Sequence, residues 1–179
     1  MKDKFILIGF HGHFEEDFLC SIKEDIRKEF NYPIRCTEIH EDIHSYFDPA
    51  RRQYDANKLL KFLENLHSLN DVKTIGIFQV DLFIPILTYI FGQAIYNGNT
   101  GIVSTFRLRN EQYGLERDDS LLMDRLRKIV IHELGHSFGL IHCHMPTCVM
   151  LSSTYVEDID QKNKAFCSHC RAKLSSKHN

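Results

Sequence analysis

The stretch "HELGHSFGLIHCHMPTCVM", residues 132–150, contains four histidines, two cysteines and a glutamate within nineteen positions. His132 and His136 are four residues apart, a spacing that puts both side chains on one face of a helix, about one turn apart. Two imidazoles in that position can share one metal ion. Glu133 lies beside them, where its carboxylate can take a proton near the ion without binding it. The stretch therefore predicts a zinc site of the type found in hydrolases.

Gly139 extends this pattern, because a glycine in the left-handed conformation ends a helix and turns the chain back. His142 can then reach the same ion as a third ligand. Three neutral imidazoles leave the zinc a fourth, open position, where bound water ionises near pH ~7. The full pattern H-E-x-x-H-x-x-G-x-x-H predicts His132, His136 and His142 as zinc ligands and Glu133 as the general base, in preference to two chance histidines on a helix.

Four of the six cysteines form two closely spaced pairs, Cys143 with Cys148 and Cys167 with Cys170. Four thiolates in two short pairs are the usual makeup of a closed structural zinc site. Free buried cysteines or two disulfides are the alternatives, and a reducing cytosol disfavours disulfides. If residues 142–144 are extended, His142 and Cys143 point to opposite sides, so the two zinc sites are expected to be neighbours.

The pattern of the remaining chain predicts one α/β domain. Apolar runs alternate with helical periods in the order β-α-β-α-β, which is typical of a mainly parallel, twisted sheet. These segments are strands at 5–10, 33–39 and 72–80 and helices at 17–30 and 55–69. Asn97-Gly98, between two apolar runs, predicts a hairpin that adds one antiparallel edge strand.

Two further helices are expected in the C-terminal half. Asp119 is predicted to cap a helix that begins at Ser120 and continues its buried face through His132 and His136. A last helix is expected over residues 161–174, with Asp158 and Asp160 as its capping residues.

The charge and the apolar runs of the sequence limit the kinds of partner that the protein is expected to bind. Lys and Arg together number 22 against 24 Asp and Glu, and the formal net charge of −2 provides no basic field for nucleic acid. The apolar run Phe5–Phe10 is too short for a signal peptide or a membrane span, and no later run reaches that length. We therefore expect a cytoplasmic monomer with neither a membrane nor a nucleic-acid partner.

The sequence resembles the archaemetzincins, a group within the metzincin zinc metallopeptidases. The likeness rests on "HELGHSFGLIH" at 132–142, on the cysteine that follows it, on "CVM" at 148–150 and on "CSHC" at 167–170. It implies a metzincin-like zincin of the α/β (α+β) class over residues 1–179, with an active-site helix and a C-terminal helix stapled by zinc. It also implies two Zn²⁺ per chain, one on the three histidines and one on Cys143, Cys148, Cys167 and Cys170. Met150 corresponds to the methionine of the turn beneath the metal, although the residue type alone would suit a core gap.

The predicted activity is peptide-bond hydrolysis, in which Glu133 takes a proton from zinc-bound water and the substrate is a peptide or protein. An exposed edge strand can bind such a substrate by main-chain pairing, and the candidate residues are Gly92, Gln93, Ala94, Ile95 and Tyr96. Tyr155 is a candidate donor to the tetrahedral intermediate, and His144 and His169 are candidate competing ligands. The alternatives are a catalytically weak or inactive zinc-stabilised module that binds peptides or proteins, and a zinc-knuckle nucleic-acid binder.

Overall fold

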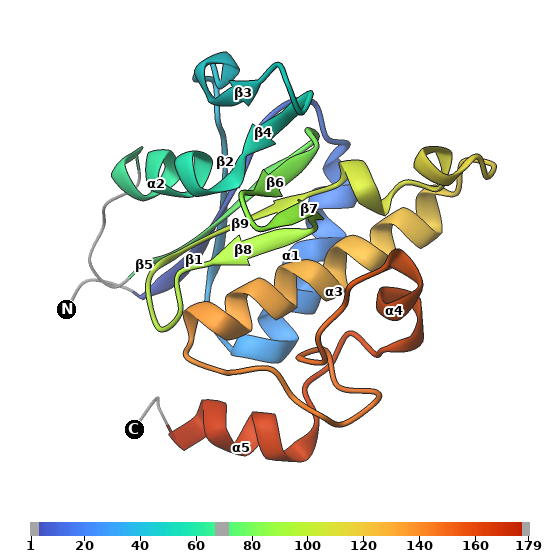
Figure 1. Ribbon diagram of the computed structural model, residues 1–179. Coiled ribbons are helices and arrows are strands. Elements are labelled where there is room, and N and C mark those ends of the chain that lie inside the picture. Colours follow the sequence, from blue (N-terminus) through green and yellow to red (C-terminus); the bar gives the residue numbers. More distant parts are fainter. Residues whose placement is uncertain (1–3, 67–71, 177–179) are drawn as a thin grey trace.

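The computed structural model describes residues 4–66 and 72–176. Its main sheet contains the strands β1 (Phe5–Phe10), β2 (Ile34–Glu38), β5 (Val72–Phe78), β8 (Gly92–Ala94) and β9 (Thr100–Ser104). They lie in the order β2-β1-β5-β9-β8 (Figure 1). Neighbours pair in parallel except β8, which is antiparallel to β9. The prediction of a mainly parallel sheet with one antiparallel edge strand is confirmed.

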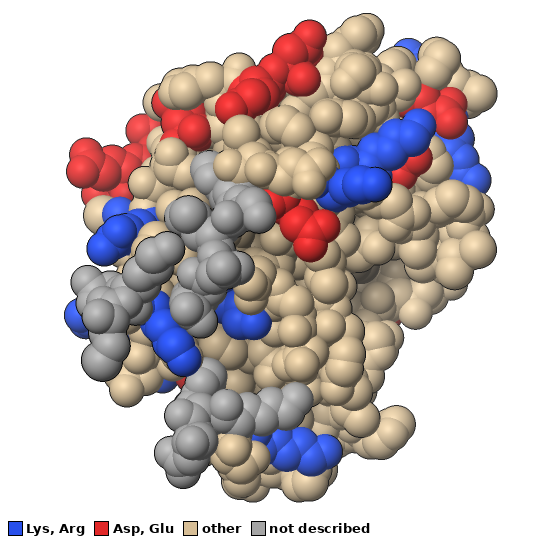
Figure 2. Space-filling view, turned by 90° about the vertical axis from the view of Figure 1, so that its left-hand side faces the viewer, with Lys and Arg blue, Asp and Glu red and all other residues tan. Residues whose placement is uncertain are grey.

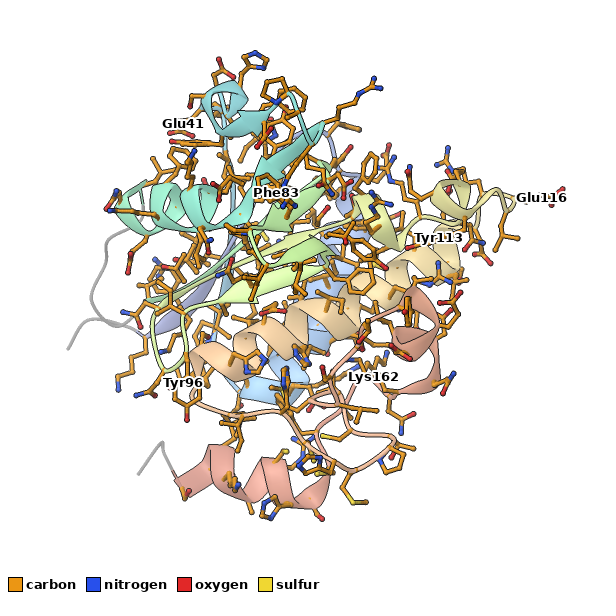
Figure 3. All side chains as sticks on the ribbon, viewed as in Figure 1. Glu41, Phe83, Tyr96, Tyr113, Glu116 and Lys162 are labelled. Carbon is orange, nitrogen blue, oxygen red and sulfur yellow. The ribbon has the colours of Figure 1, made fainter. Side chains whose placement is uncertain are left out.

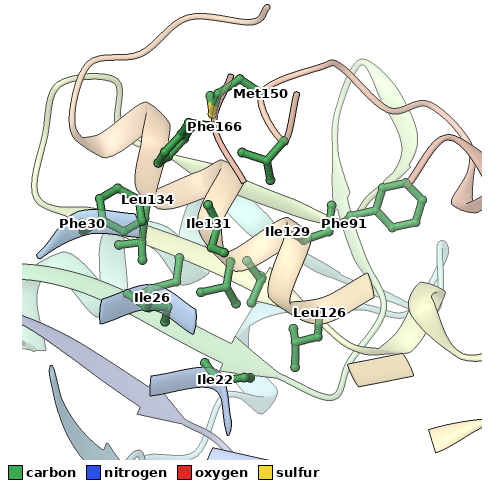
Figure 4. Close-up of a cluster of buried hydrophobic side chains, with 14 of the residues drawn as sticks. Ile22, Ile26, Phe30, Phe91, Leu126, Ile129, Ile131, Leu134, Met150 and Phe166 are labelled. Carbon is green, nitrogen blue, oxygen red and sulfur yellow. The ribbon is translucent and has the colours of Figure 1, made fainter. Parts of the chain in front are cut away.

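Helices cover both faces of this sheet, because successive strand residues point to opposite sides and both sides are apolar. The helices are α1 (Glu16–Phe30) and α3 (Asp119–Ser137) on one face and α2 (Ala56–Leu66) on the other. Ile77 belongs to the buried cluster under α1 and α3, whereas its neighbour Phe78 packs with Leu63 of α2. Figure 4 shows α3 between Ile22 and Ile26 on one side and Met150 and Phe166 on the other. The helix that carries the histidines is therefore a core element.

A second, smaller sheet was not predicted. Its strands are β3 (Phe47–Asp48), β4 (Gln53–Asp55), β6 (Leu82–Ile84) and β7 (Leu87–Ile90), in the order β3-β4-β6-β7. Strands of two to four residues are too short for an alternating pattern to be recognised. Arg51 supports the β6–β7 turn by donating to the carbonyls of Leu87 and Pro85. This sheet extends the wall beside β8.

The C-terminal segment differs from the prediction. It forms two helices, α4 (Val156–Gln161) and α5 (Ser168–Ser176), instead of one helix over 161–174. Asp158 caps the start of α4, where its carboxylate accepts the N–H groups of Thr154 and Tyr155, both at 2.8 Å. Asp160 forms an ion pair with Arg125 of α3 and caps nothing. Three short 3-10 turns complete the described elements, at His44–Tyr46, Phe106–Leu108 and Asn110–Tyr113.

The surface carries charges of both signs. On the face shown in Figure 2, acidic and basic side chains are interspersed among uncharged ones. Among the helices of residues 4–66 and 72–176, none has the length and apolar character needed to cross a membrane.

Candidate metal centre and active site

Helix α3 positions the histidine motif. It begins at Asp119, one residue earlier than predicted, and its cap is Asp118, whose carboxylate accepts the N–H of Leu121 at 2.9 Å. It ends at Ser137. Gly139 has a φ of 80° and returns its N–H to the carbonyl of His136 at 2.8 Å, so the predicted left-handed glycine at the helix end is confirmed. The chain then turns back across the end of the helix.

The imidazoles of His132, His136 and His142 converge, with ring centroids 4.7–5.3 Å apart. Nδ1 of His132 donates to the carbonyl of Val149 and Nδ1 of His136 to that of Leu140, both at 2.8 Å. Because a carbonyl can only accept, both protons lie on Nδ1, and both Nε2 atoms present lone pairs. Burial lowers the pKa of all three imidazoles, that of His132 well below its ordinary value, which keeps them neutral.

This donor set fits a zinc ion. The Nε2 atoms of His132 and His136 are 3.1 Å apart, and the candidate ligand atoms of the three histidines all lie within 4.8 Å of one another. Two nitrogens bound to one tetrahedral zinc at ~2.0–2.1 Å stand about 3.3 Å apart.

The sulfur atoms of Cys143, Cys148, Cys167 and Cys170 form a second cluster. Cys143 and Cys167 are 3.8 Å apart, as are Cys148 and Cys170, and all four are free thiols. That separation is far longer than the ~2.05 Å of a disulfide but equals the edge of a tetrahedron with zinc–sulfur bonds of ~2.3 Å, about 3.8 Å. The backbone N–H of Cys170 is the main cause that lowers the pKa of Cys167 to about 7, which favours its thiolate, whereas burial raises the pKa of Cys148 and Cys170.

Met150 connects the two clusters. Its side chain is fully buried beside Gly135, where a Cβ atom would lie 2.5 Å from the methionine sulfur. Only glycine at position 135 lets the methionine lie so close to α3. The Met150 carbonyl accepts the N–H of Cys143 at 2.9 Å, and Cys143 directly follows His142 in the chain. The expected closeness of the two clusters follows from this short connection.

Glu133 is buried against β8. A Cβ atom on Gly92 would lie 2.8 Å from Cγ of Glu133 and 3.0 Å from its Oε1, so the carboxylate occupies space that any other residue at position 92 would fill. Burial raises the pKa of Glu133 to about 8, and the ammonium of Lys162 opposes that rise. A carboxylate with a pKa close to neutral is suited to both accept and return a proton at neutral pH.

A cleft of about 570 Å³ runs past these groups, and the three histidines and Glu133 line it. Strands β7 and β8 supply residues of one wall, and the segment 152–155, which leads into α4, supplies the other. The hydroxyl of Tyr89 donates to the carbonyl of Thr154 at 3.3 Å and so joins the two walls. The geometry provides a site for an extended chain beside a carboxylate and a cluster of imidazoles.

Residues 13–176 match the family described as Peptidase family M54. The chain belongs to this family. A protein named archaemetzincin from Saccharolobus solfataricus is 41% identical over 130 residues, which cover 73% of this chain and 70% of that protein. Another from Thermococcus kodakarensis is 40% identical over 131 residues, with coverage of 73% and 70%.

Solved structures agree with this M54 assignment. A zinc-dependent peptidase from Methanocorpusculum labreanum superposes with a TM-score of 0.85 at 30% identity, covering 94% of this chain and 99% of that one. An archaemetzincin from Methanopyrus kandleri gives a TM-score of 0.84 at 29% identity, with coverage of 97% and 95%. The resemblance to archaemetzincins and the mixed α/β zincin fold are confirmed. As an M54 member, the chain is a zinc metallopeptidase that hydrolyses peptides or proteins, and the inactive binding module is not favoured.

The predicted substrate residues of this M54 chain are divided between two places. Gly92, Gln93, Ala94 and Tyr155 line the cleft, whereas Ile95 and Tyr96 are not among the described residues that line it. The Tyr96 hydroxyl donates instead to the carbonyl of Gly139 at 3.2 Å. His144 and His169 are exposed and belong to neither ligand cluster of the described residues.

Several cleft residues were not foreseen. Lys162 is buried in the cleft wall, and Tyr89 comes from the second sheet. No motif or spacing in the sequence marks either of them, because each reaches the cleft only through tertiary packing.

Proposed function

We propose that His132, His136 and His142 hold the catalytic zinc and that Glu133 transfers the proton during peptide hydrolysis. One observation carries the proposal: the Nε2 atoms of His132 and His136 lie 3.1 Å apart while both Nδ1 atoms donate to carbonyls. Two lone pairs directed at each other at that distance repel, and a shared cation turns the repulsion into attraction.

When zinc is bound, it supplies a Lewis acid that makes water a nucleophile near neutral pH. Glu133 accepts a proton from the attacking water and delivers it to the nitrogen of the departing amine. Its burial keeps the carboxylate away from bulk water, and the bare backbone of Gly92 gives it a fixed place beside the cleft. The neutral imidazoles keep their protons on Nδ1 and stay fixed by the carbonyls of Val149 and Leu140.

We propose that the substrate lies along β8. This strand is at the edge of the main sheet, and its pairing with β9 leaves its other side open for main-chain hydrogen bonds. Gln93 of this strand is among the residues that line the cleft. The exposed Tyr155 lines the cleft and remains a candidate donor to the carbonyl that is attacked.

We propose a second, structural zinc on Cys143, Cys148, Cys167 and Cys170, and hence two zinc ions per chain. The chain is then one domain that acts as a monomer, because a single copy supplies both donor clusters and the cleft. A reducing compartment such as the cytoplasm suits four free thiols at ligand spacing. The net charge of −2 gives no support for a nucleic-acid partner.

The test compares the native protein with Glu133→Gln on a mixture of diverse peptides, analysed by mass spectrometry. We expect the variant to lose all cleavage while its zinc content stays unchanged, because the amide keeps the shape but cannot accept the proton. Glu157→Gln, an exposed carboxylate on α4, is the matched control and should cleave normally. Equal cleavage by native protein and Glu133→Gln would remove Glu133 from the mechanism.

A further inference from the structure

Lys162 is a buried cation in the wall of the active-site cleft. Its side chain is 2% exposed, and it lines the cleft together with Glu133 and the three histidines. The ammonium donates one hydrogen bond, at 2.8 Å, to the carbonyl of Leu151. In Figure 3 it lies just below α3, on the side of the helix that faces the C-terminal segment. The peptidase chemistry described above does not use it.

The other buried cations of the chain all have carboxylate partners. Among the described residues the buried cationic side chains are Arg125, Lys128 and Lys162. Arg125 pairs with Asp160 at 2.7 Å and Lys128 with Asp124 at 2.6 Å. Lys162 forms no ion pair with any described residue. Because an unpaired buried charge is unfavourable, the missing partner indicates a place that a ligand's negative charge can fill.

The cleft also offers a second unused donor. Ser153 lines the same cleft, and its Oγ is buried without a hydrogen-bond partner in the described part of the chain. A hydroxyl and an ammonium can donate to the two oxygens of one carboxylate. The hydrogen bond between Tyr89 and Thr154, next to Ser153 in the chain, joins the two walls of the cleft at this point.

Lys162 is the feature of the cleft that suits an anion. Among the described lining residues, Glu133 supplies a carboxyl group and Lys162 an ammonium group. Burial lowers the pKa of Lys162 to about 8, so the ammonium form still predominates at pH 7, with Glu133 acting in the opposite direction. Since Glu133 is reserved for proton transfer, the charge of Lys162 remains available to the substrate.

We propose that Lys162 and Ser153 form a subsite that recognises a carboxylate on the peptide substrate close to the bond that is cleaved. This rests on the proposed function, because the subsite belongs to the same cleft. The carboxylate is either an acidic side chain or the free C-terminus. Lys162 is thus a residue that determines specificity.

The experiment uses two pairs of matched peptides. The two peptides of the first pair differ only in having Glu or Gln at the positions next to the cleaved bond. The two peptides of the second pair differ only in having a free or an amidated C-terminus. We expect native protein to favour the carboxylate member of one pair by about tenfold or more in kcat/KM, the usual effect of a hydrogen bond to a charged group. The pair that shows the preference identifies the source of the carboxylate.

The variants separate recognition from structure. Lys162→Met should cleave both members of that pair at similar rates, so the ratio of their two kcat/KM values should fall from about tenfold or more to about one. Lys162→Arg and Ser153→Ala should retain part of the preference. Lys58→Met also removes one positive charge, but from an exposed position on α2, and it should leave the preference intact.

Binding to Glu133→Gln, measured by calorimetry with the same peptides, tests recognition without hydrolysis. Equal binding and equal cleavage of acidic and neutral peptides by protein with an intact Lys162 would overturn the proposal, whether or not Lys162→Met folds. An unchanged preference in a folded Lys162→Met would do the same. Absence of any cleavage by zinc-loaded native protein would instead contradict the proposed function, and the binding comparison would still decide on the subsite.

Discussion

Replacing Gly92 by alanine tests how closely hydrolysis depends on the position of Glu133. The added Cβ would lie 2.8 Å from Cγ of Glu133 and 2.9 Å from the carbonyl oxygen of Ile102. Carbon atoms normally make contact at about 3.5 Å, so Cγ must withdraw by about 0.7 Å. The carbonyl belongs to β9, which is hydrogen-bonded on both sides, and cannot yield as easily. The carboxylate of Glu133 is therefore the group that moves.

Two effects of Gly92→Ala can be separated. Overpacking of this kind lowers the free energy of unfolding by about 1–3 kcal/mol, which in a chain of this size corresponds to a melting temperature lower by about 2–12 °C. A misplacement approaching 1 Å at a reacting group lowers the rate by up to about a hundredfold, so we expect kcat/KM to fall by about ten- to a hundredfold. The assay measures kcat/KM on one peptide and the melting temperature of the same preparation.

Gly76→Ala is the matched control, because its Cβ would lie 2.7 Å from Cδ2 of Leu63 and 2.8 Å from Cε2 of Phe78, on the face of β5 that packs against α2. It should lower the melting temperature by a similar amount and leave the activity of the folded protein near native. Native kcat/KM in Gly92→Ala, or an equal loss of activity in both variants, would refute the argument that Gly92 fixes the carboxylate.

Three more outcomes are expected from the metal clusters. Elemental analysis should give two zinc ions per chain, since three histidines and four cysteines exceed one tetrahedral site, and a value of one would contradict the second site. Met150→Leu should keep both ions and most activity, because a swap of similar volume usually costs under ~1.5 kcal/mol; loss of the histidine-bound ion would show a role beyond packing. A mild chelator should abolish activity before it lowers the melting temperature. The double variant Cys167→Ser, Cys170→Ser should instead lower the melting temperature markedly. The reverse pattern would mean that the histidine cluster holds the structural ion and the cysteine cluster the catalytic one.

The sequence indicated that the three histidines converge because their geometry is local. Four residues separate His132 from His136 on one helix, and Gly139 needs only its own backbone conformation to turn the chain. The start of α3 was misplaced by one residue because Asp118 and Asp119 are both good caps, and only the hydrogen bond to Leu121 distinguishes them.

What could not be predicted depends on distant parts of the chain. Gly92 lies against Glu133 from another element, and no sequence period links the two. The prediction of a single C-terminal helix was wrong because it also depended on a distant residue. Asp160 pairs with Arg125, thirty-five residues away, instead of capping a helix. Lys162 has no motif at all. Its meaning comes from the lack of an ion-pair partner among the described residues, which can be seen only in three dimensions.

The main-chain partners of the two helical histidines have a consequence for tolerance to mutation. Metal-binding histidines often rely on carboxylate side chains as outer partners, and those are lost by a single substitution. Here the partners are the carbonyls of Val149 and Leu140, which every amino acid supplies. Residues 140 and 149 can therefore change identity during evolution, within the limits of packing, without releasing the imidazoles. Related chains can keep the same orientation of their histidines while showing no trace of it in an alignment of side chains.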